Sequence, residues 1–219
     1  MPHYIPTCEN AVSTVPEWHR AVFQGHEERV TSSEGWSPGA LNLAQGIAMK
    51  LHTPLVHAEV TRLLIDLGRH PKDDERWSTW SHKLTEEQRE KLDLRVKEPY
   101  LQAIITRVED AQKRGDEVIH LSLDTDPEAL PGTLEFQYDA RRNSEGECVA
   151  EWSRGLQNAL PDLIIRRSSP PSRSLSSYLR RKFPDLGSIR LSVAQSAFLT
   201  GQPIPWMKLK KAITDTLPR

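Results

Sequence analysis

Apolar residues recur at either helical or strand spacing over most of the chain, and the two kinds of segment alternate. The clearest helix of the N-terminal half is predicted over residues 37–53, with Ser37 as its N-cap and Pro38 at its first helical position. Its apolar positions follow a helical period: Ala40, Leu41, Leu43, Ala44, Ile47, Ala48 and Leu51. This segment is therefore expected to bury one face against a sheet.

A second helix is predicted over residues 99–115, with Gly115 as its C-cap. One face carries the apolar side chains Leu101, Ile104, Ile105 and Val108. The segment "EVIHLSL" (117–123) then reads as a buried strand, and Asp124 and Asp126 follow it directly. Open α/β sheets bind ligands at the carboxyl ends of their strands, so this pair of acids marks a candidate site.

The remaining segments continue the alternation. A short strand is expected to end near Cys8, a strand and a second extended or turn-forming piece at 54–60 and 62–67, and a solvated helix at 84–96. Further strands are predicted at 133–139, 162–168 and 188–196, and further helices at 146–160, 174–184 and 203–217. This order predicts one domain over residues 1–219, folded as a three-layer α/β/α sandwich with a mixed sheet.

Charge and cysteine content narrow the function classes. The 29 basic and 30 acidic side chains nearly cancel, so no overall field favours nucleic acid or a membrane surface as a partner. Cys8 and Cys148 form no C-x-x-C pair, which disfavours a disulfide framework or a thiolate zinc site. The N-terminus resembles no signal peptide, and no window approaches the ~18 apolar residues of a membrane span. A cytoplasmic location is the resulting expectation.

Five stretches, in this order and spacing, carry a resemblance: "CEN" (8–10), "GALNLAQGIAMKLHTPLVHAEVTRLLIDLGR" (39–69), "VIHLSLDTDP" (118–127), "LEFQYDARR" (134–142) and "SIRLSVAQ" (188–195). Together they resemble the N-formylglutamate amidohydrolase family, zinc-dependent hydrolases that share a fold with zinc carboxypeptidases. The resemblance covers nearly the whole chain and implies a phosphorylase/hydrolase-like fold.

The resemblance also implies where a metal centre would be. The zinc ligands of such enzymes match Asn10, Asp124 and Ser37, an upstream histidine matches Ser33, and late glutamates, one of them a general base, match Arg190 and Ser192. Amide and hydroxyl groups are poor zinc ligands, and a catalytic zinc needs about three protein ligands and a base.

We therefore expect a non-catalytic relative without a metal cofactor. Its vestigial pocket is expected at Asn10, Ser37, Asp124 and Ser192, and it would bind a small anionic ligand or a protein partner. The alternative is a metal-dependent hydrolase of N-acyl or N-formyl amino acids that uses substitute ligands such as Glu9 and Asp124.

Arg62 and Arg69 match arginines that, in such enzymes, would grip a substrate carboxylate through a bidentate fork. Gly68 stands where the family has asparagine. The competing interpretation is a structural ion pair of Asp66 with Arg62 or Arg69, and the sequence leaves the two about even. If the first holds, the partner is a small carboxylate.

Other polar residues have ordinary interpretations. Asp124 and Asp126 suit a hard cation, but Asp-Thr-Asp-Pro is strong turn chemistry, so an Asx-turn is favoured. His120 is expected to be a hydrogen-bonded core histidine and Cys8 a buried thiol. The basic segment 166–184 is predicted to be a solvated loop followed by an amphipathic helix, in preference to a phosphate or nucleic-acid site.

Overall fold

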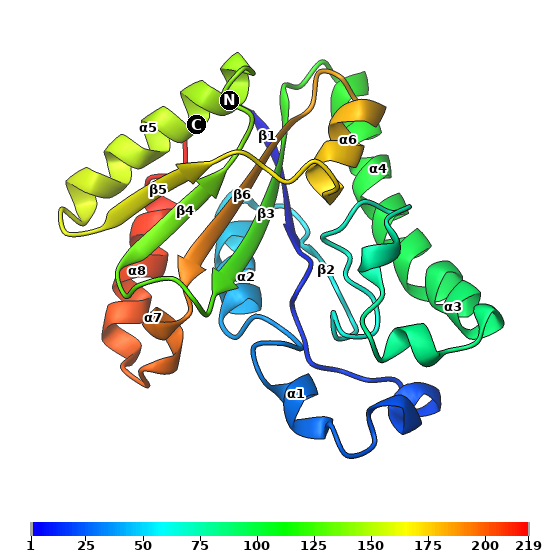
Figure 1. Cartoon of the computed structure of the whole chain (residues 1–219). Helices are drawn as coiled ribbons and strands as arrows, with labels where there is room; N and C mark the ends of the chain where they lie inside the picture. Colours follow the sequence, from blue (N-terminus) through cyan, green and yellow to red (C-terminus); the bar gives the residue numbers. More distant parts are fainter. Residues whose placement is uncertain (1, 219) are drawn as a thin grey trace.

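A six-stranded mixed sheet forms the centre of the protein (Figure 1). The computed structural model describes residues 2–218, and the strands lie in the order β2-β1-β3-β6-β4-β5. Strand β4 runs antiparallel to β6, whereas every other neighbouring pair is parallel. The strands are β1 (His3–Cys8), β2 (Val56–His57), β3 (Val118–Asp126), β4 (Thr133–Gln137), β5 (Ile164–Ser168) and β6 (Gly187–Ala194).

Helices cover both faces of this sheet, which confirms the three-layer α/β/α prediction (Figure 1). One layer contains α2 (Ala40–Leu51), α5 (Asn143–Ala159) and α8 (Pro203–Asp215). The other contains α4 (Glu98–Lys113) and α6 (Leu175–Lys182). The shorter helices are α1 (Glu27–Thr31), α3 (Glu86–Leu92) and α7 (Ser196–Leu199). No helix among residues 2–218 is long and apolar enough to cross a membrane.

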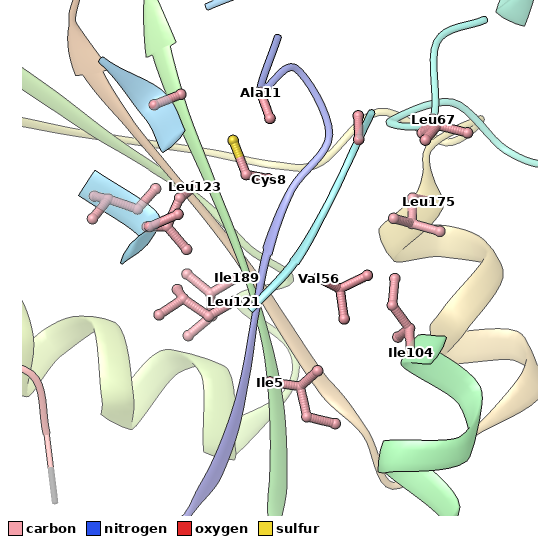
Figure 2. Packing of buried hydrophobic residues seen from close by; sticks show 14 of the residues in the cluster. Ile5, Cys8, Ala11, Val56, Leu67, Ile104, Leu121, Leu123, Leu175 and Ile189 are labelled. Atoms are coloured by element: carbon pink, nitrogen blue, oxygen red, sulfur yellow. The ribbon is translucent and has the colours of Figure 1, made fainter. Parts of the chain in front are cut away.

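Apolar side chains fill the space on each side of the sheet. Figure 2 shows Leu121, Leu123 and Ile189 on one side of the strands and Ile5 and Ile104 on the other. All five are less than one tenth exposed and belong to one cluster of buried residues. Because side chains alternate along a strand, the residues between them on β3 and β6 face the α4–α6 layer. That face is where polar groups enter the interior.

The start of α2 differs from the sequence prediction. Gly39, not Ser37, is the N-cap, and the helix begins at Ala40. The Ala40 amide donates to the Ser37 carbonyl at 3.0 Å in a turn that precedes the helix. Gly39 has a φ of 90°, and a Cβ there would lie 2.8 Å from Cγ of Phe198, so only glycine fits this turn. The Ser37 side chain is consequently free to join the polar site instead of capping a helix.

Other predicted elements also differ from the structure in their boundaries. The strand expected at 54–60 contains only the two residues of β2, whereas 62–67 forms turns, one of the two forms expected for it. The helices expected at 84–96 and 99–115 are joined by a π-helical turn at Asp93–Lys97. Strand β6 ends at Ala194, because α7 begins two residues later. Gly115 follows α4 with a φ of 81°, as expected for a glycine at a helix end.

Candidate functional site

Two central strands place polar side chains on one face of the sheet. On β3, His120, Ser122 and Asp124 occupy alternate positions, and Leu121 and Leu123 point to the opposite layer. The register pairs these three positions with Ser188, Arg190 and Ser192 of β6. A buried polar band therefore runs along the middle of the sheet beneath α4 and α6.

Three residues of this band, His120, Ser122 and Arg190, lie in the floor of a cavity of about 280 Å³. Arg190, Ser122 and Gln137 contribute from the strands, whereas segments 66–69 and 170–176 form the rim. The two rim segments are tied together, because the Leu175 amide donates to the Gly68 carbonyl at 2.8 Å. Charged side chains in the lining are four arginines and two acids: Arg62, Arg69, Arg173, Arg190, Glu9 and Asp66. Cationic groups therefore outnumber anionic ones in this cavity.

Asp124 forms an ion pair with Arg190, and of the two only Arg190 lines the cavity. The Asn10 amide lies 3.4 Å from Oδ2 of Asp124. Burial alone would raise the pKa of Asp124, but the Arg190 guanidinium, the Ser37 hydroxyl and the Arg62 charge together hold that pKa below its usual value. The Asp124 charge in turn raises the pKa of Arg190. Both members are therefore charged at neutral pH.

Glu9, at the end of β1, accepts three hydrogen bonds from hydroxyl groups. Its Oε1 accepts from Thr7 at 2.5 Å and from Tyr100 at 2.8 Å, and its Oε2 accepts from Ser122 at 2.5 Å. The side chain is 3 % exposed. A carboxylate with this many donors is compensated for its burial without a metal ion.

His120 connects the Glu9 cluster to a second buried network. Its Nε2 lies 2.9 Å from Oγ1 of Thr7 and its Nδ1 lies 2.8 Å from Oγ of Ser188. Because the Thr7 hydroxyl donates to Glu9, the arrangement that satisfies every group has Nε2–H donating to Thr7 and Ser188 donating to Nδ1. The ring is fully buried, and burial lowers its pKa to about 4. His120 is thus the hydrogen-bonded core histidine predicted from the sequence.

The two predicted ligand arginines both line the cavity, but they are held differently. Nη2 of Arg62 donates to the carbonyls of Ser33 at 2.7 Å and Trp36 at 2.9 Å, and to Ser37 Oγ at 3.2 Å. These contacts fix the segment that precedes α2. Arg62 is therefore anchored through Nη2 alone, and its buried Nε has no hydrogen-bond partner among residues 2–218.

Arg69 lies at the more exposed rim. Its Nε is 3.7 Å from Oδ2 of Asp66, and its Nη1 donates to Glu75 at 2.8 Å. Asp66 also accepts from the Gly68 amide at 2.9 Å. Desolvation by burial raises the pKa of Asp66, against the lowering effect of that amide and the surrounding arginines. An Asp66–Arg69 ion pair is present, in line with the structural interpretation, while Arg69 still reaches the cavity.

The acid pair at the end of β3 is divided between two roles. Oδ1 of Asp126 accepts from the Glu128 amide at 2.8 Å, which is the predicted Asx-turn. Asp124 takes no part in that turn, so the prediction was wrong for it: it remains within β3 and points at Arg190 because its strand position faces the polar side. Ser192, paired with Asp124 in the sheet register, is buried beside it.

The three positions that the resemblance matches to zinc ligands do lie together, since Asn10 and Ser37 both lie beside the Asp124 carboxylate. The side chains present do not fit a catalytic zinc, however. Within residues 2–218, no three His, Cys, Asp or Glu side chains are grouped to hold a metal ion. The two acids nearest this point, Glu9 and Asp124, are committed to hydroxyl donors and to a guanidinium. A cationic arginine beside the ligand position would also repel a divalent cation.

Several residues of the site were missed by sequence reasoning. Tyr100, Gln137 and Arg173 were assigned no role, and Arg190 was considered only as the counterpart of a glutamate. One signal was available: "HLSLD" on β3 and "SIRLS" on β6 alternate polar and apolar residues inside otherwise buried strands. Alternation of this kind indicates a polar face. Tyr100 and Arg173 gave no such signal, because only tertiary packing brings them here.

The segment 166–184 was predicted to be a solvated loop and helix, and this is correct for its exposed part. Arg173 is largely exposed, 3.4 Å from Asp73. Arg180 differs: its side chain is 10 % exposed and pairs with the buried Glu145. The basic residues of α6 therefore do not all face solvent.

Comparison with solved structures shows the same fold in other proteins. The gene product Atu2144 from Agrobacterium tumefaciens superposes with a TM-score of 0.78 at 18% identity, over 99% of this chain and 90% of that one. N-formylglutamate amidohydrolase from Ralstonia eutropha superposes with a TM-score of 0.68 at 15% identity, over 98% and 92% of the two chains. No protein-family model and no curated protein matches the sequence. The fold is therefore amidohydrolase-like, as the resemblance implied.

Proposed function

We propose that this protein is a non-catalytic relative of N-formylglutamate amidohydrolase that binds a small carboxylate in the cavity beneath α6, without a metal cofactor. The observation that carries the proposal is the ion pair of Asp124 with Arg190, the arginine of the cavity floor. It joins Asp124, which the resemblance matches to a zinc ligand, to Arg190, which it matches to one of the two late glutamates. A general base and a metal-bound water are both needed for hydrolysis of this kind, and most of the positions that the resemblance matches to them carry residues that serve neither purpose well.

The lining supports anion binding. Four of its six charged side chains are arginines, and a guanidinium binds carboxylates through paired N–H donors. The cavity of about 280 Å³ lies near the lower end of the volumes typical of small-molecule sites. A compact metabolite with a carboxylate is the ligand class that fits this charge and size.

Metal content and hydrolysis test the proposal together. Chain purified without chelator and then dialysed against zinc is expected to retain less than about one tenth of an equivalent by elemental analysis, because the ligands are missing. It is also expected not to hydrolyse N-formylglutamate. Stoichiometric zinc with chelator-sensitive hydrolysis would favour the alternative, a hydrolase with Glu9 and Asp124 as substitute ligands. In that case Asp124→Asn would abolish both zinc binding and turnover.

A further inference from the structure

This inference rests on the proposed function. We propose that Arg190 binds the carboxylate of the ligand. Its guanidinium then provides the positive charge that a metal ion would provide at this position. Gln137 of β4 lies opposite Arg190 in the antiparallel register and is the second recognition group. Together these two side chains form the carboxylate-binding site, on the face of the sheet that lines the cavity.

Most N–H donors of the Arg190 guanidinium make no hydrogen bond to other groups among residues 2–218. Its hydrogen bonds within residues 2–218 go to Asp124 through Nη2 alone. A guanidinium has five N–H donors, and the Arg190 side chain is 32 % exposed where it lines the cavity. The donors that Asp124 does not use are therefore presented to a molecule in the cavity.

The charge at this place is both permanent and held in position. Arg190 lies on a central strand between β3 and β4, and Asp124 on the neighbouring strand fixes its head group. An arginine stays protonated at any physiological pH, so the site needs no cofactor to attract an anion. A donor fixed in advance costs little entropy when the ligand binds, which favours affinity.

Gln137 complements this arrangement. It faces the same cavity, and only its backbone is paired in the sheet, so its side-chain amide makes no hydrogen bond to other groups among residues 2–218. Side chains at paired antiparallel positions lie about 5 Å apart at Cβ, so the Gln137 amide and the Arg190 fork can contact the two oxygens of one carboxylate. Ser122 is not available for this purpose, because its hydroxyl donates to Glu9.

Calorimetric titration of the chelator-treated full chain with succinate, and separately with acetate, tests this inference. The informative comparison is between Asp124→Asn, which breaks the ion pair but keeps the guanidinium, and Asp124→Asn/Arg190→Gln, which removes the guanidinium without leaving a buried unpaired carboxylate. The double variant is expected to bind succinate at least about tenfold more weakly than the single variant, given the usual strength of hydrogen bonds to charged groups. Arg167→Gln, an exposed arginine on β5, is the matched control and is expected to keep wild-type affinity.

The outcomes separate the two proposals. If wild type binds succinate and the two Asp124 variants bind it equally, Arg190 is only a structural partner of Asp124, and this inference is overturned while the proposed function stands. If wild type binds neither succinate nor acetate, the proposed function fails, and this inference fails with it. Circular dichroism of each variant shows that the fold is kept in the comparison.

Discussion

Replacing Glu145 with alanine is expected to lower the free energy of unfolding by about 3–5 kcal/mol, the usual cost of removing one partner of a buried ion pair. Glu145 is fully buried in the first turn of α5, and its carboxylate is bonded by Arg180 Nε and Nη2 at 2.8 and 2.7 Å. The amides of Ser188 and Asp139 also donate to it, at 3.0 and 2.8 Å. The substitution leaves an almost fully buried guanidinium, the buried Ser188 amide and the partly buried Asp139 amide without this acceptor.

Denaturant unfolding followed by circular dichroism measures this loss. Glu147→Ala is the matched control, since Glu147 is an exposed glutamate two positions further along α5 and is expected to change stability by less than about 0.5 kcal/mol. A loss below about 1 kcal/mol for Glu145→Ala would mean that Arg180 finds another partner and that this network is not rigid. Because Ser188 bonds both Glu145 and His120, the variant also tests whether the two buried networks are connected.

The protein is expected to lose roughly 3 kcal/mol of stability as pH falls from about 6.5 to about 4 because of His120 alone, at about 1.4 kcal/mol per pKa unit. Burial lowers the pKa of His120 to about 4, and the nearby Arg180 acts in the same direction, while Glu9 opposes it. Between these two pH values the unfolded chain binds a proton on this side chain and the folded chain does not. Acid therefore favours unfolding over this range, and the effect of His120 is complete below about pH 4.

The difference between wild type and His120→Gln isolates this contribution, because glutamine keeps a donor and an acceptor but does not titrate. Unfolding free energies measured at several pH values are expected to decline less steeply for the variant between pH 6.5 and 4. His82→Gln, at an exposed histidine, provides the reference and should keep the wild-type slope. Equal slopes for His120→Gln and wild type would indicate that His120 is protonated in the folded protein.

The layered fold could be predicted because apolar periodicity is a local property. The helix at 98–113 and strands β3 and β6 were recognisable from their side-chain spacing alone. Boundaries failed where tertiary contacts override local preference. Ser37 and Pro38 form a good helix start, but the turn is set by the contact of Gly39 with Phe198, some 160 residues away in the chain.

The candidate site was predictable only in part. The resemblance directed attention to Asn10, Ser37 and Asp124, and these side chains do meet. The sequence did not show that an arginine lies among these side chains. Arg190 contacts Asp124 because β6 lies next to β3, and the order of strands in the sheet was not predicted. The occupation of Arg62 by three acceptors before α2 likewise depends on how the loop folds back.

A crystal structure of the wild-type chain soaked with both zinc and succinate, with diffraction recorded at the zinc absorption edge, tests most directly whether the positive charge of this pocket belongs to the chain. We expect a carboxylate of succinate against the Arg190 guanidinium and Gln137, the Asp124–Arg190 pair retained, and no anomalous peak in the cavity. A zinc peak between Glu9 and Asp124, with Arg190 turned away, would contradict the account.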